Sequence, residues 1–220
     1  MVYEVWRESV IKHFPGPEFT YMLWTDETAR QLIAHEYPTY LTMYDSLPNS
    51  LARADAARTF ILHRHGGLYL DLDYEVRNSF WYRLPVDAPA VVGSYFPDER
   101  TQNSLMSSPI GHPFWNATWE RMAEQLRSGC ESAVECTGPQ VTDFVADLFP
   151  GHVVVLPCEI FMPVATGDGS GKYHTLMPWE RAIWYKLGWY RKCGKEPDEG
   201  ESTCVQAVHH SVASTAGIIS

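Results

Sequence analysis

Apolar side chains recur along this chain at two spacings, one typical of helices and one typical of strands. Residues 3–13 carry them at helical spacing, and Pro15-Gly16-Pro17 ends that segment. The aromatic-rich residues 19–24 indicate a strand, after which Thr25 or Asp26 can cap a helix that runs to residue 36. The chain is therefore expected to open with a helix followed by a strand-helix unit.

The same alternation continues as far as residue 156. We expect helices over residues 40–47, 49–65, 114–127 and 138–148, and strands over residues 68–73, 90–96 and 152–156. Residues 102–113 are rich in serine and are expected to form a turn region. Because strands alternate with helices, the pattern favours an α/β fold with a mostly parallel central sheet.

Length and charge bound the possible functions. At 220 residues with 45% hydrophobic side chains, residues 1–220 are expected to form a single domain that buries about 70 to 75% of its unfolded surface. The formal net charge of −10 argues against nucleic acid as a partner, although a metal and one or two arginines could still neutralise a nucleotide. No apolar run approaches the about 20 residues that a membrane span needs.

The five cysteines, at positions 130, 136, 158, 193 and 204, lack the C-x-x-C spacing of zinc and redox sites. We expect most of them to be ordinary reduced or buried thiols. Cys130 and Cys136 could close a small loop in an oxidising compartment. The N-terminal residues carry acidic side chains early and no long apolar segment, which is not the pattern of a secretory signal.

The most informative stretch is residues 53–76, RADAARTFILHRHGGLYLDLDYEV, in which a helix passes through Gly66-Gly67 into a short strand. Side chains alternate along a strand, so one face is expected to be core and the other a site. The two sets are Leu68, Leu70 and Leu72 on the core face, and Tyr69, Asp71 and Asp73 on the site face. In open α/β sheets, ligands bind beyond the carboxyl ends of the strands, where the two aspartates fall.

Asp71 and Asp73 supply the hard carboxylate oxygens that bind Mg²⁺ or Mn²⁺ together with substrate phosphates. An EF-hand loop does not fit, because Val76 stands where glycine is needed and Tyr82 where the glutamate belongs. The other interpretation is a solvated strand end with two unrelated acids. The D-x-D spacing alone leaves both open.

Three further features also have two interpretations each. Asp55 and Arg58 are i, i+3 neighbours and form either part of a site or an ordinary surface pair. Gly66-Gly67 is either a ligand platform or a helix stop. His209-His210 either supplies an imidazole to a metal or is a polar surface spot.

Three sequence blocks, considered together, carry a more specific signal. They are R-A-D-A-A-R at residues 53–58, F-I-L at 60–62 and G-G-L-Y-L-D-L-D-Y-E at 66–75. In this order and spacing they resemble the sugar-nucleotide-binding core of glycosyltransferase family 32, which includes mannosyltransferases and is distantly related to the large glucosylating toxins. Looser matches follow at residues 23–27, 103–114 and 137–139 and at the terminal histidine pair.

The resemblance implies a GT-A type nucleotide-diphospho-sugar transferase fold and a role for each matching residue. Asp71 would face the donor ribose and the metal, Asp73 would be the direct metal ligand, and His209 or His210 would complete the metal site. Asp55 and Arg58 would hold the donor sugar and its phosphate side. The remaining donor-binding residues would be Tyr69, Gly66, Gly67 and Asn103.

The activity implied is a metal-dependent, retaining glycosyl transfer with Mn²⁺ or Mg²⁺ as cofactor. The donor would be GDP-mannose or a UDP-sugar, and the acceptor a glycan or glycolipid. The location would be the Golgi lumen if the chain follows eukaryotic relatives, and otherwise the cytoplasm. Two alternatives stay open, a nucleotide-sugar or glycan-binding module without catalysis and a metal-dependent phosphodiesterase.

Overall fold

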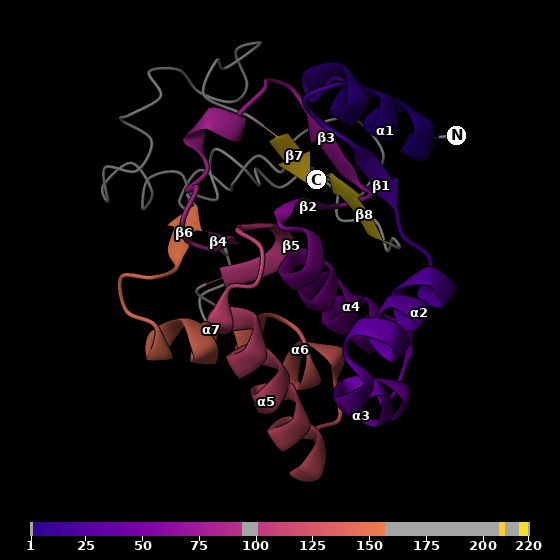
Figure 1. Cartoon of the computed structure of the whole chain (residues 1–220), viewed down its shortest axis with the longest axis vertical. Helices are drawn as coiled ribbons and strands as arrows, with labels where there is room; N and C mark the ends of the chain where they lie inside the picture. The colour runs from indigo at the N-terminus through magenta and orange to yellow at the C-terminus, as the bar shows by residue number, and fades with distance from the viewer. Residues whose placement is uncertain (1, 94–100, 157–206, 210–215, 220) are drawn as a thin grey trace, which may run out of the picture.

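The computed structural model of this chain describes residues 2–93, 101–156, 207–209 and 216–219 (Figure 1). The helices are α1 Val2–His13, α2 Asp26–Glu36, α3 Leu41–Asp45, α4 Ser50–His65, α5 Pro113–Arg127, α6 Ala133–Cys136 and α7 Pro139–Leu148, with 3-10 turns η1 Pro38–Tyr40 and η2 Trp81–Arg83. The strands are β1 Tyr21–Leu23, β2 Gly67–Asp71, β3 Tyr74–Val76, β4 Ala90–Gly93, β5 Thr101–Ser108, β6 Val154–Leu156, β7 Ala207–His209 and β8 Ala216–Ile219.

A six-stranded sheet in the order β1-β8-β2-β5-β4-β6 forms the centre, and β3 pairs with β7 in a second, two-stranded sheet. The α/β class is thus confirmed. The expectation of a mostly parallel sheet is wrong for the described strands, because in the central sheet only β4 and β6 pair in parallel, whereas the other neighbours are antiparallel. An alternation of helices and strands does not determine strand direction when a strand such as β5 returns beside β4.

The expected turn region over residues 102–113 is also wrong in its first half. Residues 101–108 form β5, which pairs with β2 on one side and β4 on the other, and the turn begins only after Ser108. Serine and asparagine have little intrinsic preference for strands, which is why the sequence suggested a turn. Pairing on both edges of β5 overrides that preference, and seven of its eight residues are buried.

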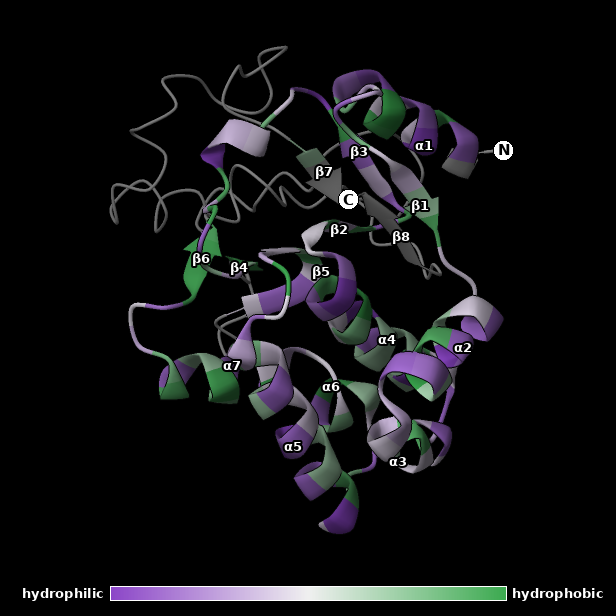
Figure 2. Ribbon diagram, viewed as in Figure 1, coloured by the Kyte–Doolittle hydropathy of each residue, from purple (hydrophilic) through white to green (hydrophobic). Residues whose placement is uncertain are grey.

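Two apolar cores lie on opposite faces of the central sheet. Alternation along the strands separates them, since Tyr69 belongs to one core while Leu68 and Leu70 belong to the other. The first core contains side chains from α2, α4, α5 and α7, and the second contains side chains from α1, β3 and the connection after it. In Figure 2, helices such as α2 and α5 carry both hydrophobic and hydrophilic residues, as expected for helices with one buried side. Both faces of β2 are therefore covered.

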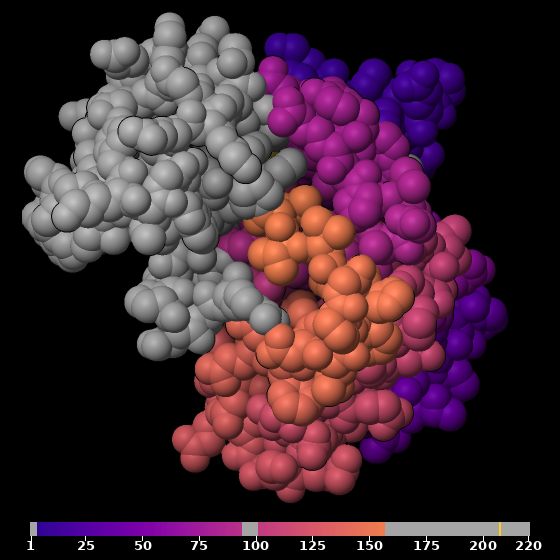
Figure 3. Space-filling view, turned by 90° about the vertical axis from the view of Figure 1, so that its left-hand side faces the viewer, coloured from indigo at the N-terminus to yellow at the C-terminus, as the bar shows by residue number. Residues whose placement is uncertain are grey.

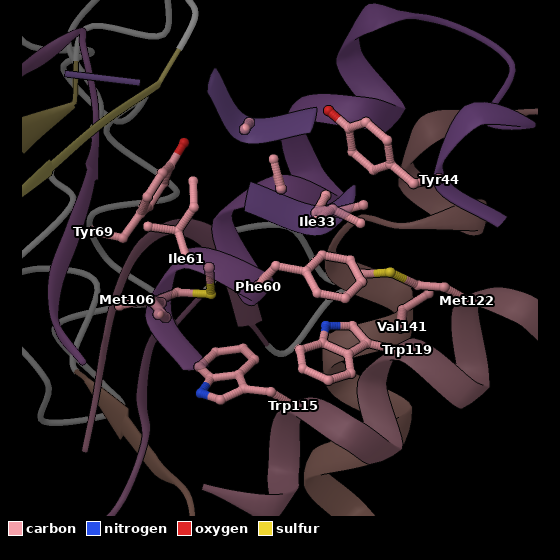
Figure 4. Close-up of a cluster of buried hydrophobic side chains, with 14 of the residues drawn as sticks. Ile33, Tyr44, Phe60, Ile61, Tyr69, Met106, Trp115, Trp119, Met122 and Val141 are labelled. Carbon is pink, nitrogen blue, oxygen red and sulfur yellow. The ribbon is translucent and has the colours of Figure 1, made fainter. Parts of the chain in front are cut away.

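The centre of the first core is an aromatic pair between α4 and α5. The rings of Phe60 and Trp119 stack with centroids 4.2 Å apart and an interplanar angle of 11° (Figure 4). Trp119 Nε1 donates a hydrogen bond of 2.8 Å to the Thr59 hydroxyl, which satisfies the one polar group of the indole. This packing holds α4 against α5.

The ends of α4 follow the sequence signals. The Asn49 side chain accepts a hydrogen bond from the Ala52 backbone N–H at the start of the helix. Gly66 follows the helix with a positive φ of 66°. A Cβ there would lie 3.0 Å from Ile110 Cγ1 and 3.1 Å from the Ser108 carbonyl oxygen, so only glycine fits between α4 and β2.

Cys130 and Cys136 form a disulfide whose Cα atoms are 5.5 Å apart. It joins the loop after α5 to the last residue of α6, a pairing that the sequence left as one of two interpretations. The other three cysteines lie outside the described residues. Figure 3 shows the neighbouring segment of α7 and β6 (orange) on the surface of the molecule.

We expect reduction of this disulfide to lower the free energy of unfolding by about 2 kcal/mol, because the bridge restricts a short loop in the unfolded chain. Urea unfolding with and without dithiothreitol measures the effect. The double variant Cys130→Ala/Cys136→Ala is the control and should not respond to the reductant. Identical unfolding curves for the oxidised and reduced wild-type chain would contradict the prediction.

Candidate functional site

The candidate site lies where α4 passes β2 and β5. Asp55 and Arg58 are one helical turn apart on α4 and both are buried, with exposed fractions of 6% and 4%. Arg58 Nη2 lies 3.0 Å from Asp55 Oδ1. The pair is therefore part of the interior, and the interpretation as an ordinary surface pair is wrong.

Arg58 connects three elements through its guanidinium group. Nη1 donates a hydrogen bond of 2.6 Å to the Asn103 carbonyl oxygen on β5 and lies 3.3 Å from Asp71 Oδ1 at the end of β2. The Arg58 Cζ atom also lies 4.7 Å from the centre of the Tyr69 ring, within the range of a cation–π contact. One side chain thus ties α4, β2 and β5 together.

Asn103 and Tyr69 complete this network. Asn103 Nδ2 donates to Asp55 Oδ1 at 3.0 Å, so the Asp55 carboxylate has partners on both α4 and β5. The Tyr69 hydroxyl donates to Asp71 Oδ1 at 2.6 Å, which confirms that these two side chains share a face of β2. Asp71 is consequently held by Tyr69 and Arg58 in a defined orientation.

Asp73 does not lie on the same strand as Asp71, contrary to the sequence expectation. β2 ends at Asp71, and Leu72 and Asp73 turn the chain into β3. Asp73 is buried, with an exposed fraction of 2%, whereas the Asp71 side chain is 17% exposed. The D-x-D motif therefore spans the strand end and the turn, with Asp71 on the solvent side.

The terminal histidines are only partly described. The backbone of His209 pairs with Tyr74, the residue after Asp73, in the β3–β7 ladder. The pairing brings the backbone of His209 beside the turn that contains Asp73, whereas its side chain and all of His210 lie outside the described residues. Within the described part of the chain, no group of three or more histidine, cysteine, aspartate or glutamate side chains gathers as a metal site would.

Gly66 and Gly67 are not brought to the carboxylates. They lie at the start of β2, whereas Asp71 ends it, and four residues of strand span about 13 Å. Gly66 instead makes the close approach to Ile110 described above. The geometry supports the helix-stop interpretation of this pair.

Burial shapes the electrostatics of the network. Burial raises the pKa of Asp55 to about 6, although the nearby Arg58 guanidinium opposes the shift. Burial alone would lower the pKa of Arg58, but Asp71, Tyr69 and Asp55 outweigh it and raise the value, so Arg58 stays charged. Burial raises the pKa of Tyr69 well above 10.0, so its hydroxyl keeps the proton that it donates to Asp71.

Three carboxylate side chains, those of Asp55, Asp71 and Asp73, lie in or beside this network together with the single guanidinium group of Arg58. Carboxylate oxygens are the ligands that Mg²⁺ and Mn²⁺ prefer. The chemistry of the donor set therefore fits such a cation at Asp71 and Asp73.

Sequence reasoning missed two neighbours of this site. Arg7 and Tyr21 line a small cavity that also contacts Asp71 and Tyr74, and the Arg7 Cζ atom lies 5.2 Å from the centre of the Tyr21 ring. The Tyr74 hydroxyl lies 3.2 Å from the Ser104 hydroxyl. These contacts join segments that are distant in the sequence, so no local motif predicts them.

The part of the chain that contains this network matches a known protein family. Residues 5–91 match the family described as "Glycosyltransferase sugar-binding region containing DXD motif". The matched segment includes α4, β2 and both aspartates of the D-x-D motif. The resemblance inferred from the sequence blocks is confirmed over these residues.

Two curated relatives align with a similar share of the chain. "Inositol phosphoceramide mannosyltransferase 3" of Schizosaccharomyces pombe is 44% identical over 98 residues, which are 44% of this chain and 27% of that protein. "Mannosyl phosphorylinositol ceramide synthase CSH1" of Saccharomyces cerevisiae is 39% identical over 99 residues, which are 45% of this chain and 26% of that protein. The matched residues span about a quarter of the length of these relatives.

A solved structure named "PaToxG Glycosyltransferase" aligns over 68% of this chain and 63% of that chain, with a TM-score of 0.48 and 13% sequence identity.

We expect Arg58→Ala to lower the free energy of unfolding by about 3 to 5 kcal/mol, because it leaves buried carboxylates without their cation. Arg58→Lys should cost less, since it keeps a charge but cannot reach Asp55, Asp71 and the Asn103 carbonyl together. Arg30→Ala is the matched control, because it removes an exposed arginine–aspartate pair with Asp45. Chemical denaturation that shows equal, small losses for Arg58→Ala and Arg30→Ala would refute the structural role of Arg58.

The pH dependence of stability tests the environment of Asp55. Its pKa is about 6 in the folded chain and 3.8 in a free side chain, so the folded state binds more protons between these values. Stability should therefore fall by about 2 kcal/mol as the pH rises from 4 to 6.

Asp55→Asn isolates this contribution, because the other titrating groups are common to both chains. The difference in unfolding free energy between wild type and Asp55→Asn should move against the wild type as the pH rises through this interval. A difference that stays constant from pH 4 to 7 would contradict the raised pKa.

Proposed function

We propose that this chain carries the catalytic domain of a metal-dependent, retaining glycosyltransferase that moves a sugar from a nucleotide-sugar donor to a glycolipid. The observation that carries the proposal is the arrangement of Asp71 and Asp73 around the end of β2, in which Arg58 and Tyr69 hold Asp71, within the matched residues 5–91. Mannose is the proposed sugar and GDP-mannose the proposed donor, because the aligned relatives are named for mannosyl transfer to inositol phosphoceramide.

A divalent cation, Mn²⁺ or Mg²⁺, would neutralise charge that develops on the departing diphosphate. Asp71 and Asp73 would hold it, with His209 or His210 as a proposed third ligand. The structure supports the pairing of these groups in two ways. Asp71 is partly exposed at the strand end while Asp73 is buried in the turn that follows, and the backbone of His209 pairs beside that turn.

The remaining residues orient this carboxylate pair and the donor. The Tyr69 hydroxyl donates a hydrogen bond to Asp71 Oδ1, and the Arg58 guanidinium lies beside the same oxygen, so these two side chains set the orientation of the Asp71 carboxylate. Asp55 and Asn103, already hydrogen-bonded to each other, would present their other polar atoms to the donor sugar. Pre-organisation of this kind reduces the entropy lost when the donor binds.

Retention of the anomeric configuration is part of the proposal. No side chain in the described network is positioned as a committed nucleophile, because each carboxylate in contact with Arg58 is engaged by it. We therefore favour attack of the acceptor hydroxyl on the face that the diphosphate leaves, with a phosphate oxygen accepting the acceptor proton. The GT-A type fold and the extent of a single catalytic domain over residues 1–220 belong to the same proposal.

Asp73→Asn should reduce Mn²⁺-dependent release of nucleotide from GDP-mannose by about a hundredfold or more, since it removes one charge that holds the cation. Asp87→Asn, which changes an exposed aspartate in the connection before β4, is the matched control and should retain the wild-type rate. Thermal unfolding of both variants establishes that the fold is intact. A folded Asp73→Asn variant that releases nucleotide at the wild-type rate would contradict the proposal.

A nucleotide-sugar-binding module without catalysis is the second candidate. The burial of Asp55, Arg58 and Asn103 favours it, because these side chains already bind one another in the chain without donor. Titration calorimetry that finds metal-dependent donor binding, with no hydrolysis or transfer across a panel of glycolipid acceptors, would select this candidate.

A further inference from the structure

The most exposed large apolar side chains of the described residues gather around one groove. Val86, Tyr82 and Ile110 are 87%, 74% and 71% exposed, the three highest values of their kind. The groove has a volume of about 320 Å³. Its lining includes Trp81, Leu84, Val86 and Ile110, and Tyr82 is the neighbour of Trp81 in η2. Clustered exposure of this kind marks an interaction surface.

We call this set of Trp81, Tyr82, Arg83, Val86 and Ile110 the Trp81 surface. In Figure 1, η2 is the unlabelled magenta turn at the upper left, in the connection that runs from β3 to β4. The groove also contains Gly66 and Gly67, at the start of β2. The carboxylates lie at the other end of that strand, about 13 Å away. The Trp81 surface is therefore separate from the candidate catalytic site.

The surface is built on a rigid base. Phe80, just before η2, is fully buried and contacts the Phe14 ring with centroids 5.3 Å apart. Trp81 packs edge-on against Phe19 at 5.4 Å, so only part of its indole faces solvent. These contacts hold Phe80 and Trp81, and with them the backbone of η2, against the second core.

The turn that carries Ile110 is equally fixed. The Gly111 backbone N–H donates a hydrogen bond of 2.8 Å to the His63 carbonyl oxygen, and Trp115 Nε1 donates one of 2.7 Å to the Ser108 hydroxyl. Apolar side chains that are held in contact with solvent lower the solubility of a protein. Their exposure here indicates that a binding partner covers them when the protein is active.

The composition of the surface indicates a lipid. Trp81, Tyr82 and Arg83 are consecutive, and tryptophan, tyrosine and arginine are the side chains that occupy the boundary between lipid headgroups and alkyl chains. The Arg83 Cζ atom lies 5.4 Å from the Tyr82 ring centre, and the Arg83 side chain is exposed beside the apolar side chains of the surface. In a chain of net charge −10, Arg83 supplies a local positive charge that complements an anionic headgroup.

Two polar atoms in the groove also suit a lipid ligand. His65 Nε2 and Ser107 Oγ are buried and have no hydrogen-bond partner among the residues that the structure describes. Both residues line the groove. A lipid offers an alkyl chain for the apolar wall and, where the chain joins the headgroup, hydroxyl or carbonyl groups for these two atoms.

We propose that the Trp81 surface docks this domain onto an anionic phospholipid membrane, with a lipid alkyl chain in the groove. The inference rests on the proposed function in one respect, because a glycolipid acceptor resides in a membrane and its transferase must work at that surface. Docking itself needs neither donor nor turnover. The two proposals can therefore fail independently.

Co-sedimentation of the full chain with vesicles tests the docking. Phosphatidylcholine vesicles with and without phosphatidylserine are compared at low and high salt. The wild type should bind the phosphatidylserine vesicles more tightly, and less so at high salt. The double variant Val86→Asp/Ile110→Asp should lower vesicle binding about tenfold or more, because two apolar side chains no longer enter the lipid.

The matched control is Val5→Asp/Leu148→Asp, which places the same charges at apolar positions 63% and 60% exposed elsewhere on the molecule. It should bind vesicles as the wild type does. Failure of the wild type to bind either kind of vesicle, or equal losses in both double variants, would overturn the docking proposal. Light scattering adds one further outcome, since a wild-type dimer that only Val86→Asp/Ile110→Asp separates would assign the surface to a second copy of the chain instead.

Discussion

The arrangement of this protein depends on one buried guanidinium group. Arg58 reaches from α4 to the Asp71 carboxylate on β2 and to the Asn103 carbonyl on β5, while it pairs with Asp55 on its own helix. A buried cation of this kind is tolerated only when charged and polar partners surround it on every side. The position of α4 against the sheet and the orientation of Asp71 are thus two consequences of one requirement. The network holds α4 against the sheet, and it leaves the Asp71 side chain partly exposed at the end of β2.

The two cores explain why the site lies at the end of a strand. Because β2 is covered on both faces, its polar side chains can reach solvent only where the strand ends. Asp71 does so, and Asp73 lies buried in the turn that follows. The opposite end of β2 is closed by Gly66, whose neighbour Ile110 belongs to an exposed apolar surface. One strand therefore separates a charged site from an apolar surface.

Sequence reasoning succeeded where the information was local. Helix α4, its cap at Asn49 and strand β2 lie within one contiguous stretch, and their periodicity predicts them directly. The shared face of Tyr69 and Asp71 follows from strand alternation alone. Strand β5 was missed because its serine-rich residues are buried only by pairing with β2 and β4, which no local pattern reports. The bond from Arg58 to the Asn103 backbone, the antiparallel sheet and the Trp81 surface likewise join residues far apart in the chain.

The central claim is that Asp71 and Asp73 together hold a divalent cation that binds the donor diphosphate. Crystals of the chain grown with Mn²⁺ and GDP, measured near the manganese absorption edge, test it most directly, because anomalous scattering locates the metal without assumptions about its ligands. The account predicts one strong anomalous peak within coordination distance of both carboxylates and of a diphosphate oxygen. A manganese peak elsewhere on the molecule, or GDP bound with no metal at these two aspartates, would contradict it.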